Sequence, residues 1–294
     1  MKLIKSNFTL NDYPRYDHER RKAYLLSNKS CDVLLESFYS TLLKALDDKE
    51  HFPIIRIADG EFQFLLGKNE FNMRKPKFML IKNLLGELYR KVFGFKFEAK
   101  SRTYTSGVYA KSDFKDVKDK YADCLKYIAN NGIVALYTII KPGFYTEQYL
   151  PKLFRFFGKN QIFLNEKNYV PFYFIYIVLT NKRYANIYDG KKIHLITSFD
   201  NKRKNKIEST LFALGVKSIT WTQISRDRSL FDNIDTNKIS FNTDIVFVGA
   251  GVGKVNIFNQ LKSFPSLIID AGYIFETWQN PNLRLERDYC NSHE

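Results

Sequence analysis

Short apolar runs alternate with helix-forming stretches along the last third of this chain, and this alternation constrains the fold more than any other feature. The runs span 192–197, 218–222, 244–248 and 266–270. Residues 53–58 and 132–140 form earlier apolar runs of the same kind. Strands that alternate with helices in this way build mostly parallel sheets covered by helices on both faces. We therefore expect an α/β fold.

No linker divides the chain, so we expect a single domain over residues 1–294, with its α/β core at 53–279. Residues 1–50 are expected to be a helical extension, because apolar residues recur at helical spacing in its second half. These residues are Val33, Leu34, Leu35, Phe38, Leu42, Leu43 and Leu46. In open parallel sheets, ligands bind beyond the carboxyl ends of the strands, where the strand order reverses. The functional site is expected at that edge.

The formal net charge of +15 is the feature of the composition that bears most on function. It favours an acidic partner, such as nucleic acid, an anionic membrane surface or a phosphorylated substrate. The chain is also rich in Lys, Asn, Ile, Phe and Tyr, which a bias of the genome explains equally well. Charge alone therefore selects no class of function.

Three features favour the cytoplasm. Cys31, Cys124 and Cys290 share no metal-ligand or redox spacing, which is typical of free thiols in a reducing compartment. Residues 1–22 contain no apolar core of a signal peptide. The apolar run at 169–179 is about half the ~20 residues that cross a bilayer, so it is expected to be a buried helix or strand. Peripheral contact with the inner face of the membrane stays open.

Two carboxylates flank a glycine directly after the run at 53–58. Asp59 and Glu61 are separated by one residue, so on an extended segment both side chains can face one ligand. Hard oxygen donors of this kind suit Mg²⁺ or Mn²⁺. Gly60 lets a phosphate approach closely, and Arg56 can hold a carboxylate or a phosphate with its planar guanidinium. The competing interpretation is an ordinary strand-to-helix turn with acidic capping residues.

A glycine-containing turn follows the run at 244–248, and its backbone N–H groups can cradle a phosphate. Gly249 and Gly251 are similar to a dinucleotide fingerprint, with Asp270 at the usual distance of ~20 residues. Against NAD, Lys254 stands in place of the third glycine, and the turn lies in the last crossover of the sheet. The same objection applies to S-adenosylmethionine. A phosphate or nucleotide contact that includes Lys254 remains open.

A basic turn at 198–204 opens another predicted helix. Ser198 or Asp200 can cap this helix, because side-chain oxygens accept the free N–H groups of its first turn. Lys202, Arg203 and Lys204 can reach a phosphate, although a solvated basic turn explains them equally well.

Taken together, these segments resemble the bacterial GT-D glycosyltransferases. Members of that family open with Arg-x-Gly-Asp-Gly-Glu, which carries an Asp-x-Glu metal motif, and close with a glycine loop and a strand ending in Asp-x-Gly. The matching segments here are 56–61, 248–251 and 270–273. Two positions depart from the pattern: Ala58 replaces a glycine, and Tyr273 replaces the usual histidine.

The resemblance implies a Rossmann-like fold of the GT-D type and the transfer of a sugar from a nucleotide donor, a UDP-sugar, to a glycan acceptor. It implies Mn²⁺ or Mg²⁺ at Asp59 and Glu61, and a catalytic carboxylate at Asp270 or Glu276. The residues implied to contact the donor are Arg56, Gly60, Ser198, Arg203, Gly249, Gly251, Lys254 and Tyr273. The acceptor would be a surface glycan or glycoprotein glycan, lipid-linked or protein-linked. No nucleic acid is implied.

Three alternatives stay open. A basic nucleic-acid-binding protein would explain the charge and the aromatic content, but no nucleic-acid module is recognisable and the basic residues form no single stripe. A methyltransferase would use the glycine turn for S-adenosylmethionine. A degenerate transferase would bind the donor without turnover, because Tyr273 replaces the histidine.

The metal motif generates the first prediction. Asp59→Asn and Glu61→Gln should each abolish Mn²⁺-dependent hydrolysis of the donor, because a neutral amide is a poor ligand for a hard cation. The measurement is release of the nucleotide with and without Mn²⁺, with circular dichroism to establish that each variant folds. Full activity in either variant would remove that residue from the metal site.

Overall fold

The structure is a computed structural model that describes residues 4–9, 22–25, 31–58, 61, 64–65, 113–136, 146–226 and 228–280. The strands are β1 Ile4–Thr9, β2 Lys22–Leu25, β3 Phe52–Ile57, β4 Ile133–Leu136, β5 Tyr169–Pro171, β6 Lys192–Thr197, β7 Ser218–Gln223, β8 Ile245–Gly249 and β9 Leu267–Asp270. The α-helices are α1 Cys31–Asp48, α5 Asp113–Asn131, α6 Thr146–Lys159, α7 Phe172–Thr180, α8 Asn201–Ala213, α9 Lys254–Gln260 and α10 Ile274–Gln279. Short 3₁₀ helices are η2 Lys182–Ile187, η3 Ser229–Phe231, η4 Thr236–Lys238 and η5 Gly251–Gly253.

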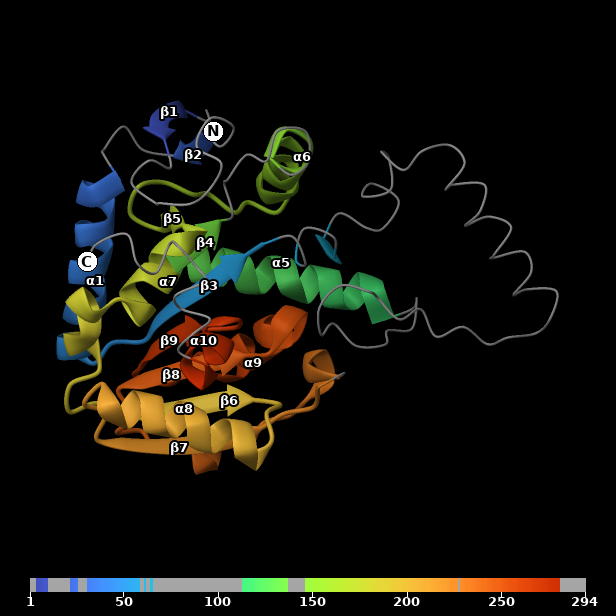
Figure 1. Cartoon of the computed structure of the whole chain (residues 1–294). Helices are drawn as coiled ribbons and strands as arrows, with labels where there is room; N and C mark the ends of the chain where they lie inside the picture. The colour runs from blue at the N-terminus through green and yellow to red at the C-terminus, as the bar shows by residue number, and fades with distance from the viewer. Residues whose placement is uncertain are drawn as a thin grey trace, which may run out of the picture.

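Seven strands form one sheet in the order β5-β4-β3-β9-β8-β6-β7 (Figure 1). Each neighbouring pair in this sheet is parallel. The central strands are buried along nearly their whole length, as sheets covered on both faces require. The β-branched residues Ile54, Ile55 and Ile57 of β3 meet that requirement. The predicted α/β fold with a parallel sheet is confirmed.

The strand order reverses beside β3. From β3 the chain builds outward to β4 and β5, and then crosses to place β6, β7, β8 and β9 on the other side. The last strand, β9, returns to pair with β3, with Ile54 opposite Ile269. The carboxyl ends of β3 and β9 therefore lie side by side at the switch point, where ligands of such sheets bind.

Two apolar clusters cover the two faces of the sheet. One packs side chains of α1, α7, α8 and α10 against residues such as Ile54, Leu195 and Phe247. The other packs α5, α6 and α9 against residues such as Ile55 and Val246. Alternate residues of each strand enter opposite clusters, as the period of two in a strand dictates. The predicted placement of helices on both faces is confirmed.

The N-terminal segment combines the predicted helix with two strands that were not predicted. Helix α1 covers the stretch with helical spacing, whereas β1 and β2 pair in an antiparallel sheet of their own. Ile4 lies opposite Leu25 in this pair. Neither strand contains a long continuous apolar run in the sequence, which is why neither was predicted.

The apolar run at 169–179 was predicted to be a buried helix or strand, and it contains one of each. Tyr169–Pro171 forms the short edge strand β5, and Phe172 begins α7. Pro171 marks the change, because it donates no ladder hydrogen bond and its φ of −58° suits the start of a helix. Within the described ranges, no helix combines the length and the apolar character needed to cross a bilayer.

Phe247 generates a prediction about the core. Its side chain is fully buried on β8, with its ring 5.0 Å from that of Trp278 and 6.4 Å from that of Tyr188, measured between centroids. Phe247→Ala should lower the free energy of unfolding by about 3–5 kcal/mol, because it leaves a cavity between these rings. Denaturant unfolding measures the change. Phe212→Ala is the control, since Phe212 is 49% exposed on α8 and should change stability by less than about 1 kcal/mol.

Candidate functional site

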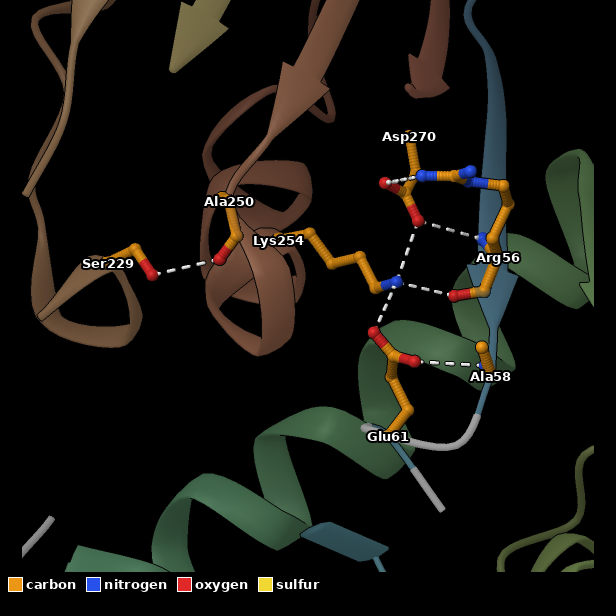
Figure 2. Close-up of polar contacts among 7 residues, drawn as sticks. All are labelled: Arg56, Ala58, Glu61, Ser229, Ala250, Lys254 and Asp270. Carbon is orange, nitrogen blue, oxygen red and sulfur yellow. Dashed lines mark hydrogen bonds and ion pairs between the residues drawn. The ribbon is translucent and has the colours of Figure 1, made fainter. Parts of the chain in front are cut away.

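Four charged side chains from distant parts of the sequence meet at the switch point (Figure 2). Arg56 lies on β3, and Glu61 follows the carboxyl end of that strand. Asp270 ends β9, and Lys254 begins α9 after the glycine turn. All are buried, with exposed fractions between 1% and 7%. The parallel pairing of β3 with β9, and of β9 with β8, brings these segments together.

Lys254 is the centre of the cluster. Its Nζ lies 2.6 Å from Glu61 Oε1, 2.7 Å from Asp270 Oδ2 and 2.5 Å from the backbone oxygen of Arg56. An ammonium has three N–H donors, so each has a protein acceptor. The sequence predicted Lys254 as a phosphate contact, and such a contact requires one of these three bonds to open.

Asp270 joins both cations. Its Oδ1 accepts a hydrogen bond from Arg56 Nη2 at 3.2 Å, and its Oδ2 accepts the backbone N–H of Arg56 at 3.2 Å in addition to Lys254. Burial alone would raise the pKa of Asp270, but the charges of Arg56 and Lys254 outweigh it and hold the pKa below its usual value. Asp270 is therefore an ionised carboxylate at neutral pH.

The pKa values of the two cations, Lys254 and Arg56, are raised. Burial would lower the pKa of Lys254, yet the charges of Asp270 and Glu61 raise it above its usual value. Burial would also lower the pKa of Arg56, and Asp270 again leads the groups that raise it. With two cations and two anions the cluster is neutral, which is how a protein keeps several charges buried.

Glu61 is held at both oxygens. Its Oε2 accepts the backbone N–H of Ala58 at 2.9 Å, while Oε1 takes the ion pair with Lys254. Reaching back by three residues is what a glutamate does in a helix-capping box, so the capping interpretation of this turn is part of the structure. The carboxylate also takes part in the buried charge cluster, which capping alone does not require.

Arg56 lies among aromatic rings that sequence reasoning did not assign to the site. The guanidinium carbon is 5.1 Å from the ring centroid of Phe172 and 5.0 Å from that of Tyr176. Both rings come from α7 and lie in the apolar run at 169–179, which the sequence predicted only as a buried helix or strand. Among the described residues, Arg56 Nε and Nη1 are buried without a hydrogen-bond partner. Buried donors without an acceptor call for an explanation, and a bound ligand oxygen is one.

Gly272, in the Asp-x-Gly segment, is fitted to the same arginine. A Cβ atom at this position would lie 2.0 Å from Arg56 Nη2, and the backbone φ of +39° is in the left-handed region. Both facts favour glycine here. The third residue of Asp-x-Gly therefore leaves room for the guanidinium that pairs with its first residue.

The glycine turn after β8 owes part of its pattern to packing. A Cβ atom at Gly249 would lie 2.6 Å from the ring of Phe275 on α10. The Oγ of Ser229 donates to the backbone oxygen of Ala250 at 2.9 Å and ties the turn to η3 (Figure 2). Packing therefore gives one reason for Gly249, and the predicted nucleotide contacts of Gly249 and Gly251 stay predictions.

The basic turn after β6 lies two strands away from β9, beyond β8. Asp200 caps α8, because its carboxylate accepts the backbone N–H of Arg203 at 2.9 Å. Ser198 is half-buried at the same carboxyl edge, and the Arg203 guanidinium is exposed, 5.1 Å from the ring of Phe199. The rings of Phe199 and Phe275 pack 5.9 Å apart. Among the described residues, no hydrogen bond or ion pair joins Arg203 to the four buried charges, and its phosphate contact stays a prediction.

The two remaining predicted residues follow β9. Tyr273, 37% exposed, is the N-cap residue of α10, and Glu276 is half-buried in the first turn of that helix. Neither is among the four buried charges. Glu276 thus differs from Asp270, whose two oxygens are already paired with cations.

The metal motif is described only in part, because Asp59 and Gly60 lie outside the described residues. Within the part of the chain that the structure describes, no group of three or more His, Cys, Asp or Glu side chains could hold a metal ion. Oxygen atoms of Glu61, Asp270 and Arg56 nevertheless converge on one positive centre, which is the Lys254 ammonium. Hard oxygen donors are the chemistry that Mg²⁺ and Mn²⁺ require, but here the ammonium uses all three, and Glu61 is the one described residue of the predicted metal motif among them, so the metal site stays a prediction.

Comparison with known proteins gives a limited result. No family model matches the chain, and no curated protein matches it. Two solved structures of domain of unknown function 1792 are similar over 86% of both chains, each at 12% identity. One, a selenomethionine-substituted structure, has a TM-score of 0.47, and the other, described as having a distinct glycosyltransferase fold, has a TM-score of 0.48. At this level of similarity, the likeness carries no inference about activity.

Asp270 generates a prediction about stability. Asp270→Asn should lower the free energy of unfolding by about 3 kcal/mol, because removing one partner leaves buried cations without compensation. Asp48→Asn is the matched control. It removes an exposed ion pair with Lys44, at 2.6 Å, and should change stability far less than Asp270→Asn does, because water and salt screen exposed pairs. Denaturant unfolding at pH 7 measures both.

Comparison of wild type with Asp270→Asn also predicts how the stabilisation by Asp270 depends on pH. Because the pKa of Asp270 is lower in the folded state, its stabilisation is present above its unfolded value of about 4 and is lost as pH falls further. The stability difference between wild type and Asp270→Asn should therefore be constant from about pH 5 to 8 and shrink below about pH 4. Taking the difference cancels the contributions of His51 and His194, whose pKa values are lowered by burial. A difference that stays constant into acid would contradict the ion-pair account.

Proposed function

We propose that this chain is a glycosyltransferase of the GT-D type, which moves a sugar from a nucleotide-sugar donor, a UDP-sugar, to a glycan acceptor. One observation carries the proposal. The segments that resemble this family at opposite ends of the core, 56–61 and 248–273, contact each other through Arg56, Glu61, Lys254 and Asp270 at the switch point. A coincidental match of short motifs gives no reason for their side chains to meet.

The donor is proposed to lie over the carboxyl ends of β3, β9 and β8. Arg56 is the residue best supported as a phosphate contact, since Nε and Nη1 are buried donors without a described partner. Gly60, Ser198, Arg203, Gly249, Gly251 and Tyr273 are proposed to line the rest of the donor site. Cleavage of the donor leaves a diphosphate with growing negative charge, which guanidinium and ammonium groups stabilise.

Mn²⁺ or Mg²⁺ is proposed as the cofactor, held by Asp59 and Glu61. When bound, the ion would supply a Lewis acid for the leaving diphosphate. Glu61 is supported as a ligand by its carboxylate, which already faces a cation at 2.6 Å.

Glu276 is proposed as the general base that takes the proton of the acceptor hydroxyl. Asp270 was the other candidate, but its lowered pKa and its two cationic partners make it a weak base. The positions of Arg56 and Lys254 depend on Asp270, so its proposed role is to position them. Glu276 is half-buried in the first turn of α10 and carries no such pairing among the described contacts.

The acceptor is proposed to be a surface glycan or glycoprotein glycan, lipid-linked or protein-linked, used in the cytoplasm or at the inner face of the membrane. The net charge of +15 supports an anionic partner, such as a lipid diphosphate. Neither nucleic-acid binding nor methyl transfer gains support from a specific contact in the described part of the chain.

Ligand-induced stabilisation tests the proposal. Nucleotide sugars with Mn²⁺ should raise the Tm, because a ligand that binds the folded state stabilises it by mass action. Glu276→Gln should keep this shift and lower kcat by about 100-fold or more, as expected when a general base is removed. Glu50→Gln is the control, since Glu50 is exposed just before the opposite end of β3.

The outcomes separate the alternatives. A Tm shift with S-adenosylmethionine and none with any nucleotide sugar would contradict glycosyl transfer. Salt-dependent retention on DNA without nucleotide binding would favour the nucleic-acid alternative. Full kcat in Glu276→Gln would remove Glu276 as the base and leave the substrate class standing.

A further inference from the structure

The carboxylate of Glu61 is held by two donors that come from different segments of the chain. Its Oε1 lies 2.6 Å from Lys254 Nζ, and its Oε2 accepts the backbone N–H of Ala58 at 2.9 Å (Figure 2). Lys254 begins α9 after the glycine turn, whereas Ala58 directly follows β3. An ammonium and a backbone N–H are also the groups with which proteins bind phosphate oxygens. The carboxylate therefore occupies a place that suits an oxyanion.

We propose that this place is a subsite for one phosphoryl group of the nucleotide-sugar donor, and that the donor binds there by displacing the Glu61 carboxylate. This phosphoryl subsite consists of Lys254 Nζ and the Ala58 N–H. Without the donor, Glu61 fills the subsite and acts as an internal competitor. The inference rests on the proposed function for the identity of the ligand, but both groups of the subsite belong to the protein and no metal ion is needed.

The charge balance of the cluster requires a carboxylate to leave. Arg56 and Lys254 carry two positive charges, and Glu61 and Asp270 carry two negative charges. A diphosphate added to this neutral group would create an excess of buried negative charge, which is strongly disfavoured. When one carboxylate turns away, two cations and one anion remain. The group then has one net positive charge to offer to the diphosphate.

Glu61 is the carboxylate that can leave. Asp270 is 1% exposed and is held by Nη2 and the backbone N–H of Arg56 as well as by Lys254. Glu61 is 7% exposed, and among the described contacts only Lys254 and Ala58 hold it. Its long, unbranched side chain can change rotamer while β3 stays in the sheet. Lys254 then keeps Asp270 Oδ2 and the Arg56 carbonyl as acceptors and has one N–H for the ligand.

Arg56 provides an independent sign of an anion at this position. Its Nε and Nη1 are buried donors without a partner among the described residues, while its Nη2 pairs with Asp270. The other oxygen of the same Asp270 carboxylate contacts Lys254 Nζ, so the guanidinium and the ammonium lie on either side of one side chain. Buried donors normally have acceptors. A diphosphate has enough oxygen atoms to contact both cations, which a single carboxylate at the subsite does not.

Rescue by inorganic phosphate tests the subsite without the donor and without an activity measurement. Glu61→Ala empties the subsite and should lower the Tm, because the buried ammonium loses a partner. With EDTA present and at constant ionic strength, phosphate should raise the Tm of Glu61→Ala more than that of wild type, since it binds in the vacated place. The double variant Glu61→Ala with Lys254→Met is the control. It keeps the space but lacks the ammonium, so phosphate should affect it no more than wild type.

Affinity for UDP gives a second measurement, in a variant that keeps the packing. Glu61→Gln has nearly the shape of glutamate but no charge, so its side chain competes less well with a phosphate. In EDTA, calorimetric titration should show about tenfold tighter binding of UDP than in wild type, as expected when one charge-assisted hydrogen bond no longer has to be broken. Glu50→Gln is the matched control, because Glu50 is exposed just before the amino-terminal end of β3 and should leave the affinity unchanged. Circular dichroism establishes that each variant folds.

The outcomes overturn different statements. Equal or weaker binding of UDP by Glu61→Gln overturns the displacement and leaves the proposed function standing. A phosphate effect on Glu61→Ala that is no larger than in wild type, or that persists in the double variant, overturns the subsite at Lys254. Rescue by phosphate with no binding of UDP by any protein, in EDTA and in Mn²⁺ alike, supports an oxyanion site and contradicts the nucleotide donor.

Discussion

The arrangement of the site depends on one buried ammonium. Lys254, the first residue of α9, forms ion pairs with Glu61 after β3 and with Asp270 at the end of β9, so it links all three segments. Without it, the carboxylates of Glu61 and Asp270 would lie close together in a buried place with Arg56 as the remaining described cation. The edge where β3 and β9 meet is thus held by charge pairing, whereas the sheet beneath it is held by apolar packing.

The sheet could be predicted because a strand buried on both faces must be apolar along its length. This apolar pattern predicts β8 and β6, and the predicted bounds, 244–248 and 192–197, agree with the observed strands to within a residue. The order of the strands could not be predicted, since it depends on which crossovers pack best together. The strands β1 and β2 were missed because no long apolar run or recognised motif marks them, whereas α6 was missed although its apolar residues recur at helical spacing.

The site was predicted as a set of residues and not as a set of contacts. Arg56, Glu61, Lys254 and Asp270 were all singled out, each for a ligand, because a charged residue at a strand end usually has that use. Their pairing with one another follows from the return of β9 to β3, which brings residues 214 positions apart into contact. Phe172 and Tyr176 were missed, because an aromatic residue in an apolar run gives no sign that an arginine will lie against it.

The close fit between Gly272 and Arg56 makes the motif at 270–273 depend on the motif at 56–61. A side chain at position 272 would displace the guanidinium, and a shorter residue at position 56 would remove this steric reason for the glycine but not the reason given by its positive φ. Among homologous chains, an arginine at position 56 should therefore be accompanied by a glycine at position 272. Such paired inheritance would mark the shared ancestry of proteins whose overall identity has fallen too far for the rest of the sequence to reveal it.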